Sequence, residues 1–235
     1  MPSRGLAVAA GLAVGLFAVP AIAQELAPIE AEIDARVIPN KVGTPKNPQP
    51  VKIVVDARLV SENGYERPVV QSGRLLLAKG GIWNGAKFPK CTAEILNRKG
   101  IPGCPKGSIF GQGYATGYAD TVRTKPKITV VNGGASKAFG YVQLTNPARV
   151  NTAVTTTIKK LSGKWAYQLD FRVPDELLVV AGVPISLTAI HLEIGKQDII
   201  VSTYCPPSRK WAYQGTSKLV DGRTVFAKGT LPCRR

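Results

Sequence analysis

The sequence predicts an all-β fold, an antiparallel β-sandwich of immunoglobulin-like or jelly-roll-like form with one or two short helical turns. Segments rich in Val, Ile, Thr and Tyr recur along the 235 residues, and this composition is typical of strands. Gly, Pro, Asn and Ser separate most of these segments, as turns require. Apolar residues make up 44% of the chain, which excludes a disordered protein and supplies enough side chains for a core.

Residues 1–23 have the pattern of a secretory signal peptide. Arg4 precedes an apolar run from Leu6 to Val19, and Pro20 and Ala21-Ile22-Ala23 follow. A positive start, a short apolar stretch and a small-x-small site predict cleavage after Ala23. The alternative is an uncleaved membrane anchor, but the run falls short of the roughly 20 residues that a span needs. We therefore expect export to the extracellular space, the periplasm or the cell envelope.

The mature chain, residues 24–235, is expected to form a single β-sandwich domain. Its composition shows no break along its length, and the alternative is two small sandwiches divided near Pro147. Its longest apolar stretch, Leu177–Ile190, is interrupted by Pro184 and by hydroxyl side chains. No transmembrane segment is therefore predicted in the mature chain.

The expected strands begin at Ile29. Ile29–Val37 alternates apolar and charged residues with a period of two, the pattern of a half-buried strand. Glu62-Asn63-Gly64, Asn132-Gly133-Gly134 and Asp221-Gly222 are hairpin signals. The other expected strands are Val51–Val60, Gly73–Lys79, Ser108–Ala119, Ile128–Asn132, Phe139–Leu144, Val150–Leu161, Trp165–Val173, Ile185–Ile194, Ile199–Tyr204, Trp211–Gly215 and Arg223–Ala227.

Two segments have helical signals. Thr92–Lys99 is long enough for two turns and ends at Gly100, a residue that favours the left-handed conformation after a helix. Asp175–Val180 follows Pro174, and its acidic first residues suit the positive end of a helix dipole. Both helices are expected to be short additions to the β structure.

The cysteines are expected to form two disulfides. The chain has four of them, and an even number in an exported protein favours disulfides. Of the possible pairings we favour Cys91–Cys104 and Cys205–Cys233, because each pair brackets a turn-rich segment. The alternative is a zinc site, which needs closely spaced Cys or His pairs that this sequence lacks. We therefore predict no metal site.

The segment around the first cysteine pair resembles a known signature. Phe88-Pro89-Lys90-Cys91 and Cys104-Pro105-Lys106-Gly107-Ser108-Ile109-Phe110-Gly111-Gln112-Gly113 match the pattern F-P-x-C … C-P-x-G-S-x-x-G-x-G. This pattern, with a C-terminal Cys pair, is similar to that of an uncharacterised family of secreted, β-rich bacterial proteins of actinobacterial type. The resemblance implies secretion and a β-rich fold and transfers no functional residue. The glycines of the strand that follows indicate a bulge or a close backbone approach.

The residues expected for catalysis are sparse. His191 is the single histidine, and its alternating surroundings place it beside Glu193 on a polar strand face. No G-x-S-x-G nucleophile elbow occurs, and Gly111-x-Gly113 lacks the third glycine of a dinucleotide-binding turn. We predict no catalytic residue and no cofactor. A hydrolase with two acids distant in sequence is the remaining enzymatic alternative.

A repeated pentapeptide is the candidate ligand site. Lys164-Trp165-Ala166-Tyr167-Gln168 recurs as Lys210-Trp211-Ala212-Tyr213-Gln214. Trp and Tyr two positions apart point to the same face of a strand, so two such strands side by side would form an aromatic platform for sugar rings. The alternative is that Trp165, Tyr167, Trp211 and Tyr213 belong to the core or pair across strands.

The charge is the broadest functional signal. Lys and Arg number 31 against 15 Asp and Glu, a formal net charge of +16, which favours attraction to polyanions. The closest basic groupings are Lys159-Lys160, Arg209-Lys210 and Arg234-Arg235, and no nucleic-acid-binding motif accompanies them. The sequence predicts a secreted, non-enzymatic interaction protein of the extracellular space or cell envelope. The alternative is a binding module for anionic or carbohydrate envelope polymers, and the oligomeric state is not predicted.

Overall fold

The computed structural model describes residues 27–62, 64 and 67–235, and the predicted signal peptide, residues 1–23, lies outside this part of the chain. Among the described residues no helix has both the length and the apolar character needed to cross a membrane. The strands are β1 (Ile29–Ile38), β2 (Gln49–Pro50), β3 (Lys52–Ser61), β4 (Val70–Ala78), β5 (Gly81–Trp83), β6 (Ile109–Ala119), β7 (Val122–Thr124), β8 (Lys127–Asn132), β9 (Lys137–Leu144), β10 (Val150–Lys160), β11 (Trp165–Arg172), β12 (Val179–Val180), β13 (Val183–Ile194), β14 (Ile200–Ser202), β15 (Lys210–Leu219) and β16 (Thr224–Pro232). The α-helices are α1 (Ala93–Lys99) and α2 (Asp175–Leu178), and the 3-10 turns are η1 (Gly85–Lys87), η2 (Ile101–Gly103) and η3 (Gln197–Ile199).

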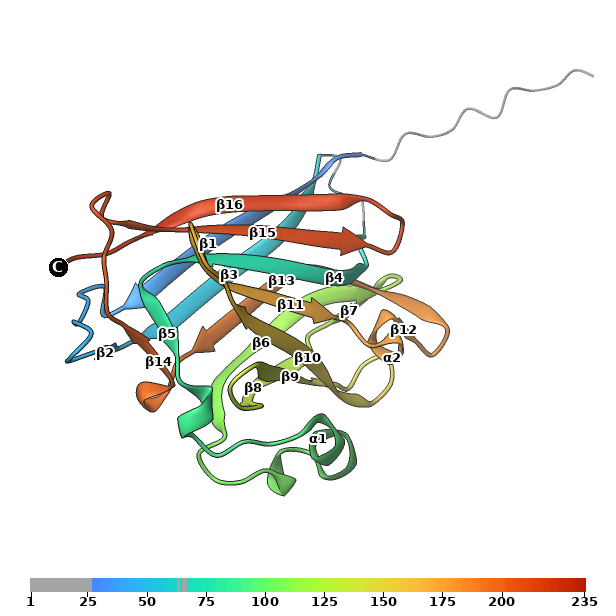
Figure 1. Ribbon diagram of the computed structural model, residues 1–235. Coiled ribbons are helices and arrows are strands. Elements are labelled where there is room, and N and C mark those ends of the chain that lie inside the picture. The colour runs from blue at the N-terminus through green and yellow to red at the C-terminus, as the bar shows by residue number, and fades with distance from the viewer. Residues whose placement is uncertain (1–26, 63, 65–66) are drawn as a thin grey trace, which may run out of the picture.

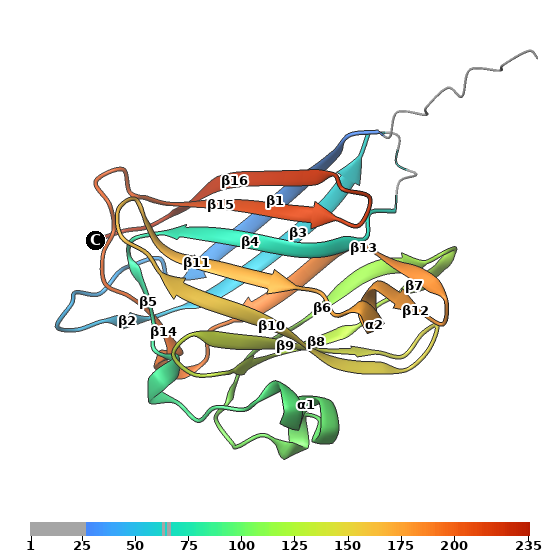
Figure 2. The same cartoon turned by 45° about the vertical axis from the view of Figure 1, so that its right-hand side comes forward.

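One long antiparallel sheet contains most of the strands, in the order β1-β3-β13-β6-β8-β9-β10-β11-β4-β15-β16. It coils so that β15, β4 and β11 lie in front of β1, β3 and β13 (Figures 1 and 2). The end strands β1 and β16 run alongside each other. Just beyond them Val42 N–H donates to Arg234 O at 2.9 Å and Arg234 N–H donates to Asn40 O at 2.8 Å. The sheet is therefore barrel-like, with two halves facing each other as in a sandwich.

The predicted all-β antiparallel fold is confirmed. The small sheet β2-β14-β5 lies beside one end of the large one. The hairpin signals at Asn132 and Asp221 are confirmed as the β8–β9 and β15–β16 turns. The hairpin signal at Glu62 is wrong, because β3 pairs with β1 and β13 and not with the strand that follows it. Pro147, near the alternative domain boundary, lies in the turn between the paired strands β9 and β10.

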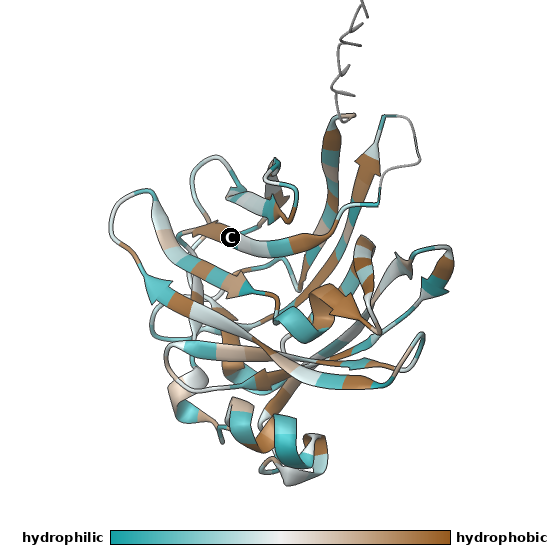
Figure 3. Ribbon diagram, turned by 90° about the vertical axis from the view of Figure 1, so that its right-hand side faces the viewer, coloured by the Kyte–Doolittle hydropathy of each residue, from teal (hydrophilic) through white to brown (hydrophobic). Residues whose placement is uncertain are grey.

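Strand alternation follows the expected pattern. Along β1 the side chains from Ile29 to Val37 are half-buried at every second position, and the intervening charged residues are exposed. Figure 3 shows the same alternation of hydrophobic and hydrophilic residues on the strands. A period of two therefore places one face of the sheet inward and the other toward solvent.

The predicted close backbone approach in β6 is confirmed. A Cβ added to Gly113 would lie 1.9 Å from the carbonyl oxygen of His191, and one on Gly117 would lie 1.8 Å from that of Ser186. Only glycine permits β13 to pass this close.

Both expected helices are present. In α1 the Thr92 Oγ1 accepts a hydrogen bond from Ile95 N–H at 3.2 Å, and Gly100 ends the helix with φ +65°. The second helix is shorter than expected, because Val179–Val180 form strand β12 against Val183–Pro184. β-branched residues favour an extended backbone when a partner strand is available.

Both favoured disulfides, Cys91–Cys104 and Cys205–Cys233, are present. All four cysteines are oxidised, so none is available as a zinc ligand.

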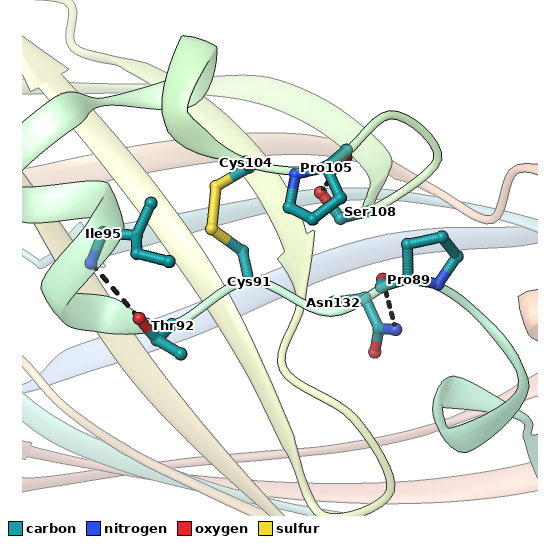
Figure 4. The surroundings of a disulfide bond; sticks show 8 residues. All are labelled: Pro89, Cys91, Thr92, Ile95, Cys104, Pro105, Ser108 and Asn132. Atoms are coloured by element: carbon teal, nitrogen blue, oxygen red, sulfur yellow. Dashed lines mark hydrogen bonds between the residues drawn. A yellow bond between two sulfur atoms is a disulfide. The ribbon is translucent and has the colours of Figure 1, made fainter.

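The signature segment surrounds one buried amide, the side chain of Asn132, which is 0% exposed. Its Nδ2 donates to the carbonyl oxygens of Gly85, Phe88 and Pro89 at 2.8, 3.2 and 3.0 Å. Its Oδ1 accepts from Gly134 N–H at 2.9 Å. Figure 4 shows Asn132 beside Pro89 and the Cys91–Cys104 disulfide. The residues of the motif thus lie in a hydrogen-bonded structural cluster.

Candidate anion-binding site

The two Trp-x-Tyr pairs do not form one platform. Strand β4 lies between β11 and β15, so the strands that carry the pairs are not neighbours. Tyr167 and Tyr213 both lie opposite Leu77 and share its inward face. Burial, with the negative charge of Asp34, raises the pKa of the Tyr213 phenol.

The two tryptophans lie in different surroundings. A bulge between Trp165 and Tyr167 pairs Trp165 with Ala78, which places it on the outer face. There the Lys164 ammonium lies 4.9 Å from the centre of its ring. Trp211 is only 8% exposed and packs against the Cys205–Cys233 disulfide. Trp211 therefore belongs to the core, which was the alternative to the aromatic platform.

A hollow of about 510 Å³ lies beside that disulfide and is lined by Pro207, Arg209, Arg234 and Arg235. We call it the arginine hollow. Arg209 precedes β15, whereas Arg234 and Arg235 follow β16. The Cys205–Cys233 disulfide and a hydrogen bond from Cys233 N–H to Arg209 O at 2.9 Å hold the two segments together.

A buried cluster holds the two segments that carry the arginines. Cys205, Trp211 and Cys233 form a buried cluster against which Val37, Val42 and Leu231 pack. Trp211 Nε1–H donates to Tyr204 O at 2.9 Å, which fixes the indole within this cluster. The backbone of Arg234 is hydrogen-bonded on both sides, to Asn40 and Val42. The backbone positions of the arginines are therefore set by the fold.

The three guanidinium groups lack acidic partners. Within the described ranges, no Asp or Glu carboxylate oxygen lies within 4.0 Å of a guanidinium nitrogen of Arg209, Arg234 or Arg235. Among the described residues, the one hydrogen bond that their side chains make runs from Arg235 Nη2 to Cys205 O at 3.5 Å. A guanidinium stays protonated and offers a planar fork of donors that fits a phosphate or carboxylate. The hollow can thus bind an oxyanion.

Arg209 also has a backbone conformation that non-glycine residues rarely adopt, with φ +54°. Such residues persist only where the surrounding structure holds them, and they are common at ligand sites.

A second, polar hollow of about 320 Å³ lies on the outer face of β6, β8 and β9, next to η2. Gln112, Thr129 and Tyr141 lie side by side across the three strands, and Lys127 and Gln143 form the next row. No side-chain hydrogen bond joins these five residues to any other described residue. Thr129 and Tyr141 are buried, so the groups available to a hydroxyl-rich ligand are the amides of Gln112 and Gln143 and the Lys127 ammonium.

His191 lies between two carboxylates on the outer face of β13. Its Nδ1 is 2.7 Å from Asp56 Oδ1, its Nε2 is 3.9 Å from Glu193 Oε1, and Tyr114 stacks on its ring at 5.2 Å. Among the described residues, no Ser or Thr hydroxyl is hydrogen-bonded to the ring. A Ser-His-Asp triad needs that hydroxyl, so this geometry does not form one. The described residues contain no group of three or more potential metal ligands.

Removal of the Lys52 charge should change the pKa of Glu193 measurably. A hydrogen bond from Lys52 and the Lys52 charge hold the pKa of Glu193 below its usual range. In a Lys52→Met variant, both effects are lost, and the Glu193 pKa should rise because an opposite charge favours the ionised carboxylate. NMR titration of the side-chain carboxyl carbon measures the shift. Lys87→Met is the control, and an unchanged Glu193 pKa in the Lys52 variant would contradict the pairing.

Comparison with known proteins gives no match to a protein-family model, a curated protein or a solved structure. The resemblance of the Phe88–Gly113 motif therefore stays a prediction.

In the sequence, Arg209-Lys210 and Arg234-Arg235 are separate basic pairs. The structure brings their arginines together. The signal that could have shown this is the favoured Cys205–Cys233 disulfide, because it joins the segments that carry the two pairs. The amides of the polar hollow had no signal in the sequence.

Proposed function

We propose that the protein is an exported, non-enzymatic binding protein that holds the phosphate or carboxylate groups of an anionic envelope polymer in the arginine hollow. The observation that carries this proposal is the convergence of three arginines, without an acidic partner among the described residues, on one hollow. Bidentate arginine–oxyanion pairs provide geometric specificity as well as energy.

The overall charge supports the same function. A formal net charge of +16, or +15 once Arg4 leaves with the signal peptide, attracts a polyanion from a distance and raises the association rate. Two disulfides suit an oxidising compartment. The polymer would reach the hollow by general attraction and be held there by the guanidinium forks.

Neutralising the hollow should weaken polymer binding. We expect Arg234→Gln/Arg235→Gln to lower the affinity for a poly(glycerol phosphate) or a polyuronate by roughly tenfold at about 150 mM salt, where general attraction is reduced. The control Lys159→Gln/Lys160→Gln removes the same charge from β10. Isothermal titration calorimetry with both polymers shows whether phosphate or carboxylate is preferred. Equal losses in the two variants, or no binding by the parent protein, would refute the proposal.

The polar hollow supports a second candidate ligand, a carbohydrate chain. Two amides and a lysine with no partner among the described residues lie there, beside the buried Thr129 and Tyr141, and such groups orient sugar hydroxyls. Gln112→Ala/Gln143→Ala would then reduce binding of a neutral oligosaccharide and leave polyanion binding intact.

A further inference from the structure

The interior of the large sheet contains apolar side chains that are not buried. Leu75 lies opposite Leu169 and Gly215, and Leu169 packs in the interior cluster around Phe110. This register places Leu75, and with it Leu77, on the inner face. Six inward residues from β1, β3 and β4 are only partly buried and belong to none of the clusters that the described residues form: Ile33, Ala35, Val55, Ala57, Leu75 and Leu77. We call them the interior belt.

Buried clusters surround the interior belt on several sides. Val70, Leu219 and Val225 pack together toward one end of the strands. Trp211 packs with the Cys205–Cys233 disulfide toward the other end. The largest cluster, around Phe110, fills the side next to β6, β8 and β11. The accessible surface of the belt thus faces a space within the molecule.

Barrel geometry explains this space. The path of the large sheet contains 11 strands, whereas about 8 strands give an interior that side chains can fill. Wider closed sheets surround a ligand, a channel or a central helix. Here α1 packs against Val131, Phe139 and Ala153 on the outer face of the sheet, and Figure 2 shows it below the strands. Among the described helices, η3 adds Ile199 to the cluster around Phe110, and none contributes a residue to the interior belt.

Small inward residues widen the space. Ala35 and Ala57 face it from β1 and β3, and Gly215 and Ala227 face it from β15 and β16. A Cβ added to Gly215 would meet only ordinary contacts, the nearest being the Ala227 Cβ at 3.7 Å. Packing therefore does not require glycine at this position, unlike Gly113 in β6.

We propose that this interior is a ligand cavity that takes the hydrocarbon chain of a fatty-acyl amphiphile. The belt consists of aliphatic side chains and no charged residue. Water needs two or more polar partners to be stable in a cavity, whereas an apolar cavity accepts hydrocarbon. This site is separate from the arginine hollow, and its chemistry does not depend on the proposed function.

Filling the cavity tests the proposal. The variant Ala57→Leu/Gly215→Leu adds side chains from the two opposing halves of the sheet. The matched control is Thr216→Leu, whose side chain points outward from the next position of β15. The probe is a fluorescent conjugated-polyene C18 fatty acid, titrated into the folded mature chain, and thermal unfolding of each variant is measured in parallel.

We expect the parent protein and the control to bind the probe with one site per chain. The filled variant should bind at least about tenfold more weakly while its Tm is not lowered, because leucine replaces empty space and glycine weakens a strand. A parent protein that binds no probe would overturn the proposal. So would a filled variant that keeps full binding, or one that unfolds at lower temperature, since overpacking destabilises an interior that is already filled.

Discussion

The Asn132→Ala variant is expected to lose about 4 kcal/mol of its free energy of unfolding, because each buried polar group left without a partner costs about 1–3 kcal/mol. The substitution leaves the carbonyl oxygens of Phe88 and Pro89 and the N–H of Gly134 without a partner, whereas Gly85 O keeps its 3.4 Å hydrogen bond from Phe88 N–H. These groups hold the segment before α1 against β8. Water entering the vacated volume would satisfy part of them, which keeps the expected cost below the sum of separate penalties.

Urea unfolding of the variant and the parent protein measures this loss. Asn151→Ala is the control, because Asn151 is exposed on β10 and its replacement should change the free energy by less than about 0.5 kcal/mol. A loss below about 1 kcal/mol for Asn132→Ala would contradict the structural role of the buried amide.

Removal of the Cys205–Cys233 disulfide is the second large effect that we expect. The bond closes a loop with a sequence separation of 28, for which the chain-entropy model gives about 3.5 kcal/mol. The Cys205→Ser/Cys233→Ser variant should also bind polyanions more weakly, because the disulfide joins the segment of Arg209 to that of Arg234. Chemical denaturation measures the stability and calorimetry measures the binding.

The matched variant is Cys91→Ser/Cys104→Ser, which opens a loop with a separation of 13 and should lose about 3 kcal/mol. Its polyanion binding should stay intact at a temperature where it remains folded. Equal binding losses in the two cysteine variants would mean that the Cys205–Cys233 bond does not organise the arginine hollow.

Local patterns predicted most of the secondary structure. The alternation from Ile29 to Val37 predicted β1, and Gly100 predicted the C-terminal end of α1. These features depend on neighbouring residues alone, through side-chain period and capping geometry. Short elements such as β5 and β12 were not predicted, because a strand of two or three residues exists only through its partner.

Features that depend on distant pairing were not predictable. The aromatic platform assumed that Trp165 and Tyr167 share a face and that their strand adjoins that of Trp211. A bulge and the insertion of β4 overturn both assumptions. Asn132 has the turn signature of Asn-Gly-Gly, and nothing local reveals that its side chain is buried against Pro89.

The arginine hollow could be predicted in part. The basic pairs at Arg209 and Arg234 are visible in the sequence, and the favoured disulfide connects their segments. The placement of Arg234 also needs the parallel bridge of Lys41 with Arg234, which joins the two ends of the large sheet. Such a contact between the start and the end of a coiled sheet has no local signal.

The most direct test of the proposed binding site keeps the charge and changes its geometry. Arg209→Lys/Arg234→Lys/Arg235→Lys leaves the net charge unchanged and removes the planar guanidinium forks. We predict that its affinity for poly(glycerol phosphate), measured by calorimetry at about 150 mM salt, falls roughly tenfold relative to the parent protein. An unchanged affinity, with the same dependence on salt, would show that general electrostatic attraction accounts for the binding and would contradict a dedicated site.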